Sequence, residues 1–283
     1  MTKKLKAAST SVTVNIVLLV SKIIVAIITS SVALFAECAH SLFDLFSSIL
    51  AFWGIKQAGK PSDDEHLFGH DKYESLSSLL QAVFITLTAL FIMYEATDKL
   101  LHPHPVENSG IGIIVMIITI PIAFLTSRYL AKVAKNEGGS HALEADSAHF
   151  TTDILGSISV LVGLIIVNLG YALGDVFAAY AVSIIMIIVS FKIMHNCYYV
   201  FMDCSPDKET MDKIKEILDS VKCISYHKLK ARTTGSNIFI DVHIQVRKDM
   251  SVEKAHDLIG KIKTKLRNEI KSIKEVSIHI EPK

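Results

Sequence analysis

The stretches His40-Ser-Leu-Phe-Asp44 and His149-Phe-Thr-Thr-Asp153 decide how this chain is organised. Each holds a His and an Asp four residues apart within an otherwise apolar segment. On a helix, this spacing puts both side chains on one face, about one turn apart. If the two helices pack side by side, two imidazoles and two carboxylates converge, and this donor set suits a tetrahedral divalent ion, zinc first. The sequence therefore predicts a four-ligand metal cage.

Two other interpretations of these polar pairs stay open. The four side chains would then be interhelical hydrogen-bonding groups, or an Asp–His proton relay without a metal. An ionisable side chain inside a membrane span is costly and is read as functional by default. The identical spacing in two separate apolar segments favours the metal site over both alternatives.

Apolar residues are unevenly distributed along the chain. It has 283 residues, is 51% hydrophobic and carries a net charge of +1, so its overall charge indicates no class of partner, nucleic acid included. About 20 mostly apolar residues cross a bilayer, and six segments qualify: Ala8 to Ile28, Val32 to Ile55, Ser75 to Leu100, Ile111 to Ala131, Ala142 to Leu169 and Val176 to Phe201. We expect an all-α membrane domain of six spans over residues 1–205 and a soluble domain over residues 206–283.

Basic residues predict the orientation of these spans, because loops rich in Lys and Arg face the cytoplasm. Such residues precede the first span and flank the loops after the second and fourth: Lys3, Lys4, Lys6, Lys56, Lys60, Lys72, Arg128, Lys132 and Lys135. The opposite connections, residues 29–31, 102–110 and 170–175, contain neither Lys nor Arg. We therefore expect an integral protein of the cell inner membrane with both termini in the cytoplasm.

The first apolar segment is read as a retained span, because it lacks a clear small-residue cleavage site. It carries two polar residues, Asn15 and Lys22. We expect these side chains to make interhelical contacts, or in the case of Lys22 to snorkel towards the membrane surface.

The residues after Ser205-Pro206 predict an α-β-β-α-β order. Residues 207–221 have helical periodicity, residues 225–233 and 237–246 read as strands, Ser251 opens a second helix, and residues 275–281 form a last strand. In the second strand, every other residue from Ile238 to Val246 is Ile or Val, which puts these side chains on one face. An α+β domain of this size has a thin core and often gains stability by dimerising or by binding metal.

The loop Pro61-Ser-Asp-Asp-Glu-His-Leu-Phe-Gly-His70 is a second candidate metal site. Asp63, His66 and His70 are close enough in sequence to wrap one ion with three ligands. The alternative is an exposed acidic loop with incidental histidines.

The soluble domain holds a third candidate. His243 lies on the polar face of the central strand, His279 and Glu281 share the polar face of the last strand, and His227 begins the first strand. His256 edges the apolar stripe of the second helix. These five residues suggest a cytoplasmic metal site, which holds either one ion or two ions with a bridging carboxylate. A solvated polar sheet face is the alternative.

Taken together, the six spans, the paired His/Asp motifs, the acidic-histidine loop and the tail resemble the cation diffusion facilitator family over nearly the whole chain. The resemblance implies a homodimeric, proton-coupled, bacterial zinc-type exporter with a metallochaperone-like cytoplasmic domain. It implies that His40, Asp44, His149 and Asp153 form the transport site, that Asp63, His66 and His70 form the loop site, and that His227, His243, His256, His279 and Glu281 form the cytoplasmic site. It also implies that Lys72 and Asp203 form a charge pair that ties the dimer together near the membrane surface.

Two departures from the family pattern bear on the metal. The well-known bacterial zinc members resemble DxxxD in the second span, where this chain has His40, and in the family a His there favours zinc over cadmium. Glu281 replaces an Asp in the tail site, and the longer side chain changes the expected geometry. The four-ligand set argues against manganese, whereas iron, cobalt, nickel and cadmium stay open as alternatives to zinc.

Other functional classes fit less well. The chain has no HExxH motif, and a filled cage leaves no open coordination position, so we expect no enzyme activity. A membrane metal sensor would need only the tail. The expected partners are a second copy of the chain, divalent metal ions, protons and the lipid bilayer.

Overall fold

The computed structural model describes residues 2–29, 32–102, 110–168, 173–221 and 225–283. The chain divides into two compact units, Met1–Cys197 and Tyr198–Lys283. The predicted boundary at Ser205 lies in the segment between the sixth and seventh helices.

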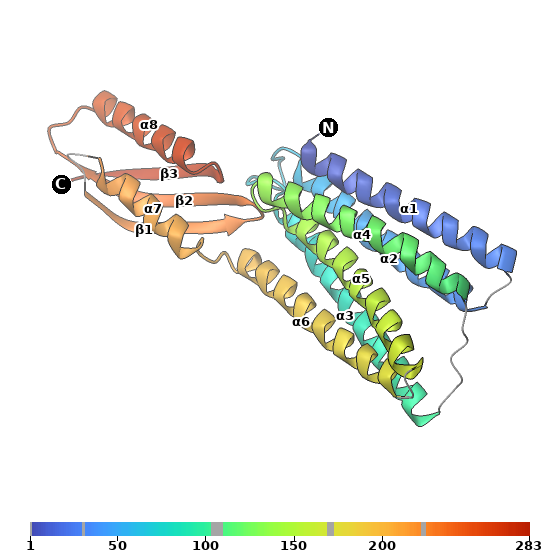
Figure 1. Ribbon diagram of the computed structural model, residues 1–283. Helices are drawn as coiled ribbons and strands as arrows, with labels where there is room; N and C mark the ends of the chain where they lie inside the picture. Colours follow the sequence, from blue (N-terminus) through green and yellow to red (C-terminus); the bar gives the residue numbers. More distant parts are fainter. Residues whose placement is uncertain (1, 30–31, 103–109, 169–172, 222–224) are drawn as a thin grey trace. The chain divides into compact units, whose positions relative to one another are not determined.

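Six long helices build the first unit (Figure 1). They follow the six apolar segments of the sequence closely. Some helices are longer than the predicted segment by about one turn, as at the start of α1 and the end of α4. Their bounds are α1 Lys3–Thr29, α2 Val32–Ala58, α3 Lys72–Leu101, α4 Gly110–Asn136, α5 His141–Asn168 and α6 Gly174–Phe201, the last residues of α6 belonging to the second unit.

Four of these helices are long and apolar enough to cross a membrane over their described residues: Lys3–Ile28, Lys72–Leu101, Ile117–Asn136 and Val176–Phe201. The two others, α2 and α5, carry the His/Asp pairs. Four of the six predicted spans are thus candidates by length and composition, and the prediction of six spans stays a prediction.

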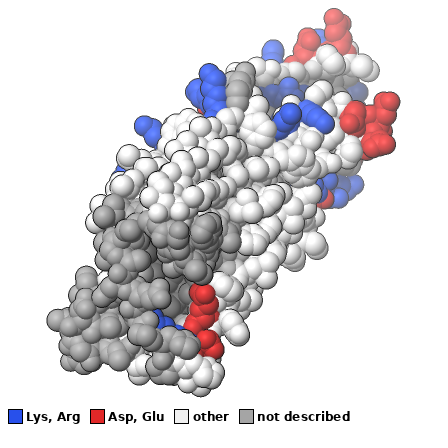
Figure 2. All heavy atoms as spheres, turned by 90° about the vertical axis from the view of Figure 1, so that its right-hand side faces the viewer, with Lys and Arg blue, Asp and Glu red and all other residues white. Residues whose placement is uncertain are grey.

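The surface of this unit is rich in apolar side chains. Large hydrophobic residues on α1, α3 and α6, such as Ile28, Leu87 and Ile188, are more than half exposed. Figure 2 shows one face with a broad zone of uncharged side chains. Such an exposed apolar surface is costly in water and is expected where a protein faces lipid.

The ligand-bearing helices α2 and α5 are neighbours, and both also contact α3. Gly54 allows the close approach of α2 to α3, because a Cβ atom at this position would lie 2.1 Å from the Ser77 hydroxyl oxygen. Helix α6 packs on α3 through Val182 and Met186. This arrangement brings α2 and α5 together in the interior, as the predicted four-ligand cage requires.

The second unit has the predicted α-β-β-α-β order: α7 Lys208–Asp219, β1 Ser225–Thr234, β2 Asn237–Val246, α8 Val252–Glu269 and β3 Ile273–Pro282. The three-stranded sheet has the order β1-β2-β3, with β1 antiparallel and β3 parallel to β2. The apolar residues of β2 form one core with those of α7 and α8, so both helices cover the same sheet face. The alternate residues of β2 lie on the opposite, open face.

A β-bulge interrupts β1 between His227 and Lys230. Lys228 has a φ of 52°, a value that L-residues other than Asn, Asp and His rarely adopt. The extra residue lets both His227 and Lys230 oppose open-face residues of β2, namely His243 and Asp241. Without the bulge, strict alternation would turn His227 towards the core.

Candidate metal sites

Asp44 of α2 meets His149 and Asp153 of α5 in the helical unit. One ligand atom from each side chain lies within 4.8 Å of the others. His149 Nε2 is 3.3 Å from Asp44 Oδ1. Asp44 is 8% exposed and His149 is 4% exposed, so this trio, here called the buried trio, is largely out of water.

The surroundings of the buried His149 ring fit a cation. Neither ring nitrogen has a hydrogen-bond partner among the described residues, although Nε2 lies close to a carboxylate. Buried polar atoms are almost always satisfied, and an unsatisfied one costs free energy. An imidazole nitrogen and two carboxylates are donors that a divalent ion accepts, so the donor set fits such an ion.

The fourth predicted ligand, His40, belongs to α2, but its side chain lies outside the described residues. The backbone spacing of one helical turn to Asp44 is as expected. The four-ligand cage therefore stays a prediction, and the ligand atoms of its three described members lie within 4.8 Å of one another.

The loop residues Asp63, His66 and His70 also come together, with ligand atoms within 4.8 Å of one another. His70 Nδ1 lies 3.0 Å from the carbonyl oxygen of Pro61. A carbonyl oxygen can only accept a hydrogen bond, so Nδ1 carries the proton, and Nε2 faces Asp63 Oδ2 at 3.2 Å. The His66 ring packs on the His70 ring at 4.5 Å between centroids. The predicted loop trio is thus assembled, with His70 buried at its base and Asp63 exposed.

The carboxylate of Asp63 is held by the turn itself. Its Oδ1 accepts the backbone N–H of His66 at 2.7 Å and that of Glu65 at 3.2 Å. The backbone hydrogen bond from His66 is the main reason that the pKa of Asp63 is lower than its ordinary value of 3.8. The side chain is therefore a carboxylate at neutral pH, as a metal ligand must be.

On the open face of the sheet, three histidines form one cross-strand row, because His243 is in register with His227 of β1 and with His279 of β3. Ring centroids are 5.4 Å apart for His227–His243 and 4.7 Å apart for His243–His279. Glu281 lies against this row: His243 Nδ1 is 2.7 Å from Oε1, and His227 Nε2 is 3.2 Å from Oε2.

Glu281 thus connects two of the histidines through its two oxygens. His227, His243 and Glu281, here called the tail trio, have ligand atoms within 4.8 Å of one another. His279 is more distant, with Nε2 at 3.8 Å from Glu281 Oε1. The hydrogen bond from His243 is the main cause of a pKa of Glu281 below its ordinary value of 4.5.

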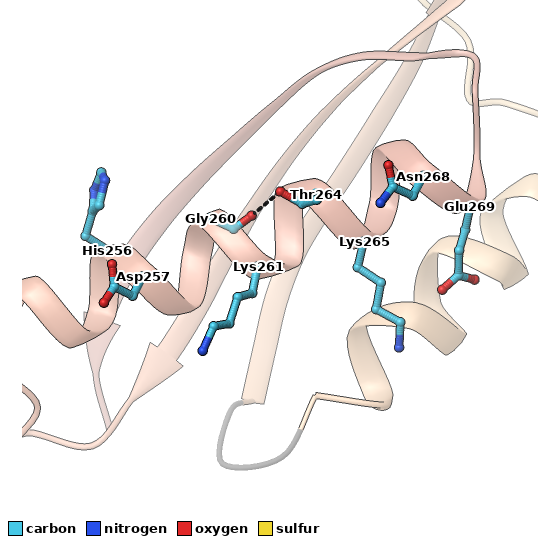
Figure 3. Close-up of a pocket in the computed structure, with 8 residues that line it drawn as sticks. All are labelled: His256, Asp257, Gly260, Lys261, Thr264, Lys265, Asn268 and Glu269. Atoms are coloured by element: carbon cyan, nitrogen blue, oxygen red, sulfur yellow. Dashed lines mark hydrogen bonds between the residues drawn. The ribbon is translucent and has the colours of Figure 1, made fainter.

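His256 is not brought to this row within one chain. It lies on α8, which covers the opposite face of the sheet. Figure 3 shows it at one end of a groove along α8 that Lys261, Thr264 and Asn268 also line. A single chain therefore does not bring His256 to the other tail residues, and its assignment as a ligand there stays a prediction.

Asp203 makes an ion pair that the sequence analysis missed. Its Oδ2 is 3.3 Å from Arg232 Nη1, and the Arg232 guanidinium lies over the Phe239 ring at 5.6 Å. Asp203 has a φ of 50° in the turn after α6. No sequence signal links the two residues, because the contact depends on how β1 returns to that turn. The predicted pairing of Lys72 with Asp203 stays a prediction.

Comparisons with known proteins find cation efflux proteins as relatives for both units of the chain. The family model of the cation efflux transmembrane domain matches residues 9–202, and that of the cytoplasmic domain of cation efflux proteins matches residues 206–283. An uncharacterized transporter of Methanocaldococcus jannaschii is 32% identical over 276 residues, 96% of this chain and 95% of the relative. The cation-efflux pump FieF of Shewanella oneidensis is 27% identical over 277 residues, 98% of this chain and 93% of the relative.

Among solved structures, the metal-bound C-terminal domain of the CzcD transporter from Thermotoga maritima is 32% identical. The match covers 26% of this chain and 87% of that chain, with a TM-score of 0.26.

Proposed function

This chain belongs to the cation diffusion facilitator family of divalent-cation efflux transporters, and on that premise we propose that it exports Zn²⁺ from the cytoplasm in exchange for protons. It is an integral membrane transporter and not an enzyme.

The buried trio is the observation that supports the proposal most. Asp44, His149 and Asp153 offer ligand atoms within 4.8 Å of one another, in the interior of the helical unit. Two carboxylates offset the charge of a dication, which a site of low dielectric constant requires. With His40 as the fourth ligand, the set would be tetrahedral and would leave no water on the ion, an arrangement that zinc accepts and magnesium does not.

Proton coupling follows from the chemistry of the imidazole. A protonated imidazole cannot ligate a metal, so protons and metal compete for the same site. A proton that reaches His149 from the outer side would displace the ion, and loss of that proton to the cytoplasm would restore the site. The unsatisfied ring nitrogens of His149 support this role, because either a proton or an ion would relieve them.

The loop trio and the tail trio are proposed as accessory metal sites. Both lie in segments that the positive-inside rule assigns to the cytoplasm, together with the two termini. The tail unit is matched by the cytoplasmic-domain family model and supports a homodimer. We propose that metal held there, with His279 as a further ligand, favours one arrangement of the dimer.

The test is metal-dependent proton flux in proteoliposomes, run with zinc, iron, cobalt, nickel, cadmium and manganese. We expect zinc to drive the largest flux and manganese none. Asp153→Ala should abolish both the metal flux and the proton flux, whereas Asp98→Asn, an exposed acidic residue of α3, should change neither. Normal flux in Asp153→Ala would exclude the buried trio as the path. Metal binding without any flux in the unmodified protein would favour a sensor.

A further inference from the structure

A buried hydrogen-bond network joins α1, α2 and α5 next to the buried trio. Its members are Ser11, Asn15, Ser48 and Asp146. Ser11, Ser48 and Asp146 are fully buried, and Asn15 is 5% exposed. None of these four side chains belongs to the predicted ligand set.

Ser48 is the centre of the network. Its hydroxyl donates to Asp146 Oδ1 at 2.9 Å, accepts from Asn15 Nδ2 at 2.7 Å, and lies 2.7 Å from the Ser11 hydroxyl. A serine hydroxyl has one hydrogen. Because Ser48 donates that hydrogen to Asp146, Ser11 must be the donor in its contact with Ser48. The Ser48 hydroxyl is therefore satisfied, whereas the other carboxylate oxygen of Asp146, Oδ2, has no hydrogen-bond partner among the described residues.

The network reaches both ligand-bearing helices close to the ligands. Asn15 Nδ2 also lies 3.3 Å from the backbone carbonyl of Asp44, so one amide group contacts α2 at the ligand and at the residue one turn beyond it. On α5, Asp146 lies one turn before His149. A single chain of hydrogen bonds, Asn15 to Ser48 to Asp146, thus connects the backbone at Asp44 with the turn that carries His149.

We propose that Asn15, Ser48 and Asp146 are positioning residues that set the separation between Asp44 and His149 and thereby the size of the ion that the site accepts. The inference rests on the proposed function of the buried trio. The three residues do not ligate the ion. They hold α2 and α5 at the spacing that now leaves 3.3 Å between His149 Nε2 and Asp44 Oδ1.

The physical reason is the sensitivity of a small dication to ligand spacing. Zinc takes nitrogen and oxygen ligands at about 2.0–2.2 Å, and larger dications take them at longer distances. Residues that orient metal ligands typically change metal affinity by about 10–100-fold when they are replaced. Loosening the α2–α5 connection should therefore weaken zinc binding more than binding of the larger cadmium ion.

The experiment compares Ser48→Ala with Ser183→Ala in proteoliposomes. Ser183 is a matched control, because it is also fully buried and, among the described residues, its hydroxyl bonds to the Ala179 carbonyl of its own helix at 2.8 Å. Two quantities are measured: the KM for zinc uptake and the cadmium concentration that halves zinc uptake. We expect Ser48→Ala to raise the zinc KM about tenfold, with a smaller change for cadmium, and Ser183→Ala to change neither.

Three further variants separate positioning from general stability. Asp146→Asn keeps a side-chain oxygen that accepts from Ser48, so it should retain more zinc selectivity than Asp146→Ala. Ser48→Thr keeps the hydroxyl and should rescue the selectivity that Ser48→Ala loses. A thermal unfolding midpoint for each variant in detergent accompanies the transport data.

Two results would overturn the inference. One is a Ser48→Ala protein with unchanged KM and unchanged cadmium competition; the other is a proportional loss for both ions that tracks the unfolding midpoint. Failure of the proposed function would give a different result. Transport would then persist in an Asp153→Ala variant whose Asn15, Ser48 and Asp146 are unchanged.

Discussion

The buried trio and the tail trio contain similar donors in opposite surroundings. Asp44, His149 and Asp153 combine two carboxylates with one imidazole inside a bundle of helices, whereas the tail trio combines one carboxylate with two imidazoles on an open sheet face. The side chain of His149 is 5% exposed, but those of His227 and His243 are 37% and 29% exposed. Water can therefore replace a departed ion in the tail and not between the helices.

This difference suggests why the two sites would serve different purposes. A buried group of like charges is costly without a compensating cation, so release of a metal there must be matched by protons or by a change of conformation. A half-exposed cluster is tolerated empty, because water screens its charges. The buried trio is suited to coupled transport, and the tail trio is suited to reporting the metal concentration.

The largest expected effect comes from Asp44→Ala in the buried trio. It removes one of two charges that balance the ion, so zinc transport should fall by more than about 100-fold, beyond the range for residues that only orient ligands. Zinc uptake into proteoliposomes measures the loss, and zinc bound at the tail should be unchanged. Simultaneous loss of tail binding would show that the two regions are not independent.

A smaller effect is expected for Glu281→Gln in the tail trio. The variant keeps the shape but removes the charge that His227 and His243 face, so zinc affinity at the tail should fall by about 10–100-fold, as for a lost charged hydrogen bond. Calorimetric titration of the full chain in a background of Asp153→Ala and Asp63→Ala, which removes a ligand from each of the other two proposed sites, isolates this site. The matched control is Glu275→Gln on the same strand, and a maximal transport rate that falls as far as the affinity would contradict the comparison.

The loop trio sharpens the comparison through its pH dependence. The pKa of Asp63 is lower in the folded turn than its ordinary value of 3.8, mainly because of the His66 backbone N–H. The turn is therefore favoured above that value and is lost as the pH falls through the lowered pKa. We expect the carboxyl carbon resonance of Asp63 to titrate below the ordinary pKa of 3.8. In Asp63→Asn this titration should be absent.

The smallest effect is expected for the charge pair near the membrane surface. Lys72→Glu should weaken the dimer by less than about fivefold, as for an exposed ion pair, and Asp203→Lys should rescue it. Because Asp203 also pairs with Arg232 at 3.3 Å, Arg232→Ala is the necessary control. Sedimentation of the three variants in detergent measures the dimer, and a dimer unaffected by Lys72→Glu would remove the predicted pairing.

Local patterns were sufficient for much of the architecture. The alternation of Ile238, Ile240 and Val242 placed His243 on the open face, and the structure confirms that face for β2. The short spacing within Asp63, His66 and His70 was enough to predict that one loop brings them together. In each case the residues are neighbours in sequence, so backbone geometry alone relates their side chains.

Contacts between distant segments could not be read in the same way. The network of Asn15, Ser48 and Asp146 was visible only as isolated polar residues in apolar segments, of which Asn15 was correctly expected to make an interhelical contact. The position of His256 on the far side of the sheet depends on which face α8 covers. Such contacts join residues whose separation is set by packing and not by chain connectivity.

By itself the sequence determined the six apolar segments, the α-β-β-α-β tail and the pairing of each His with an Asp one turn away, because periodicity decides which side chains share a face. Only the tertiary structure decided that α2 lies against α5, so that Asp44 meets His149, and that a bulge at Lys228 turns His227 towards Glu281. Periodicity assigns a face to each element, but which faces meet depends on the packing of the whole chain.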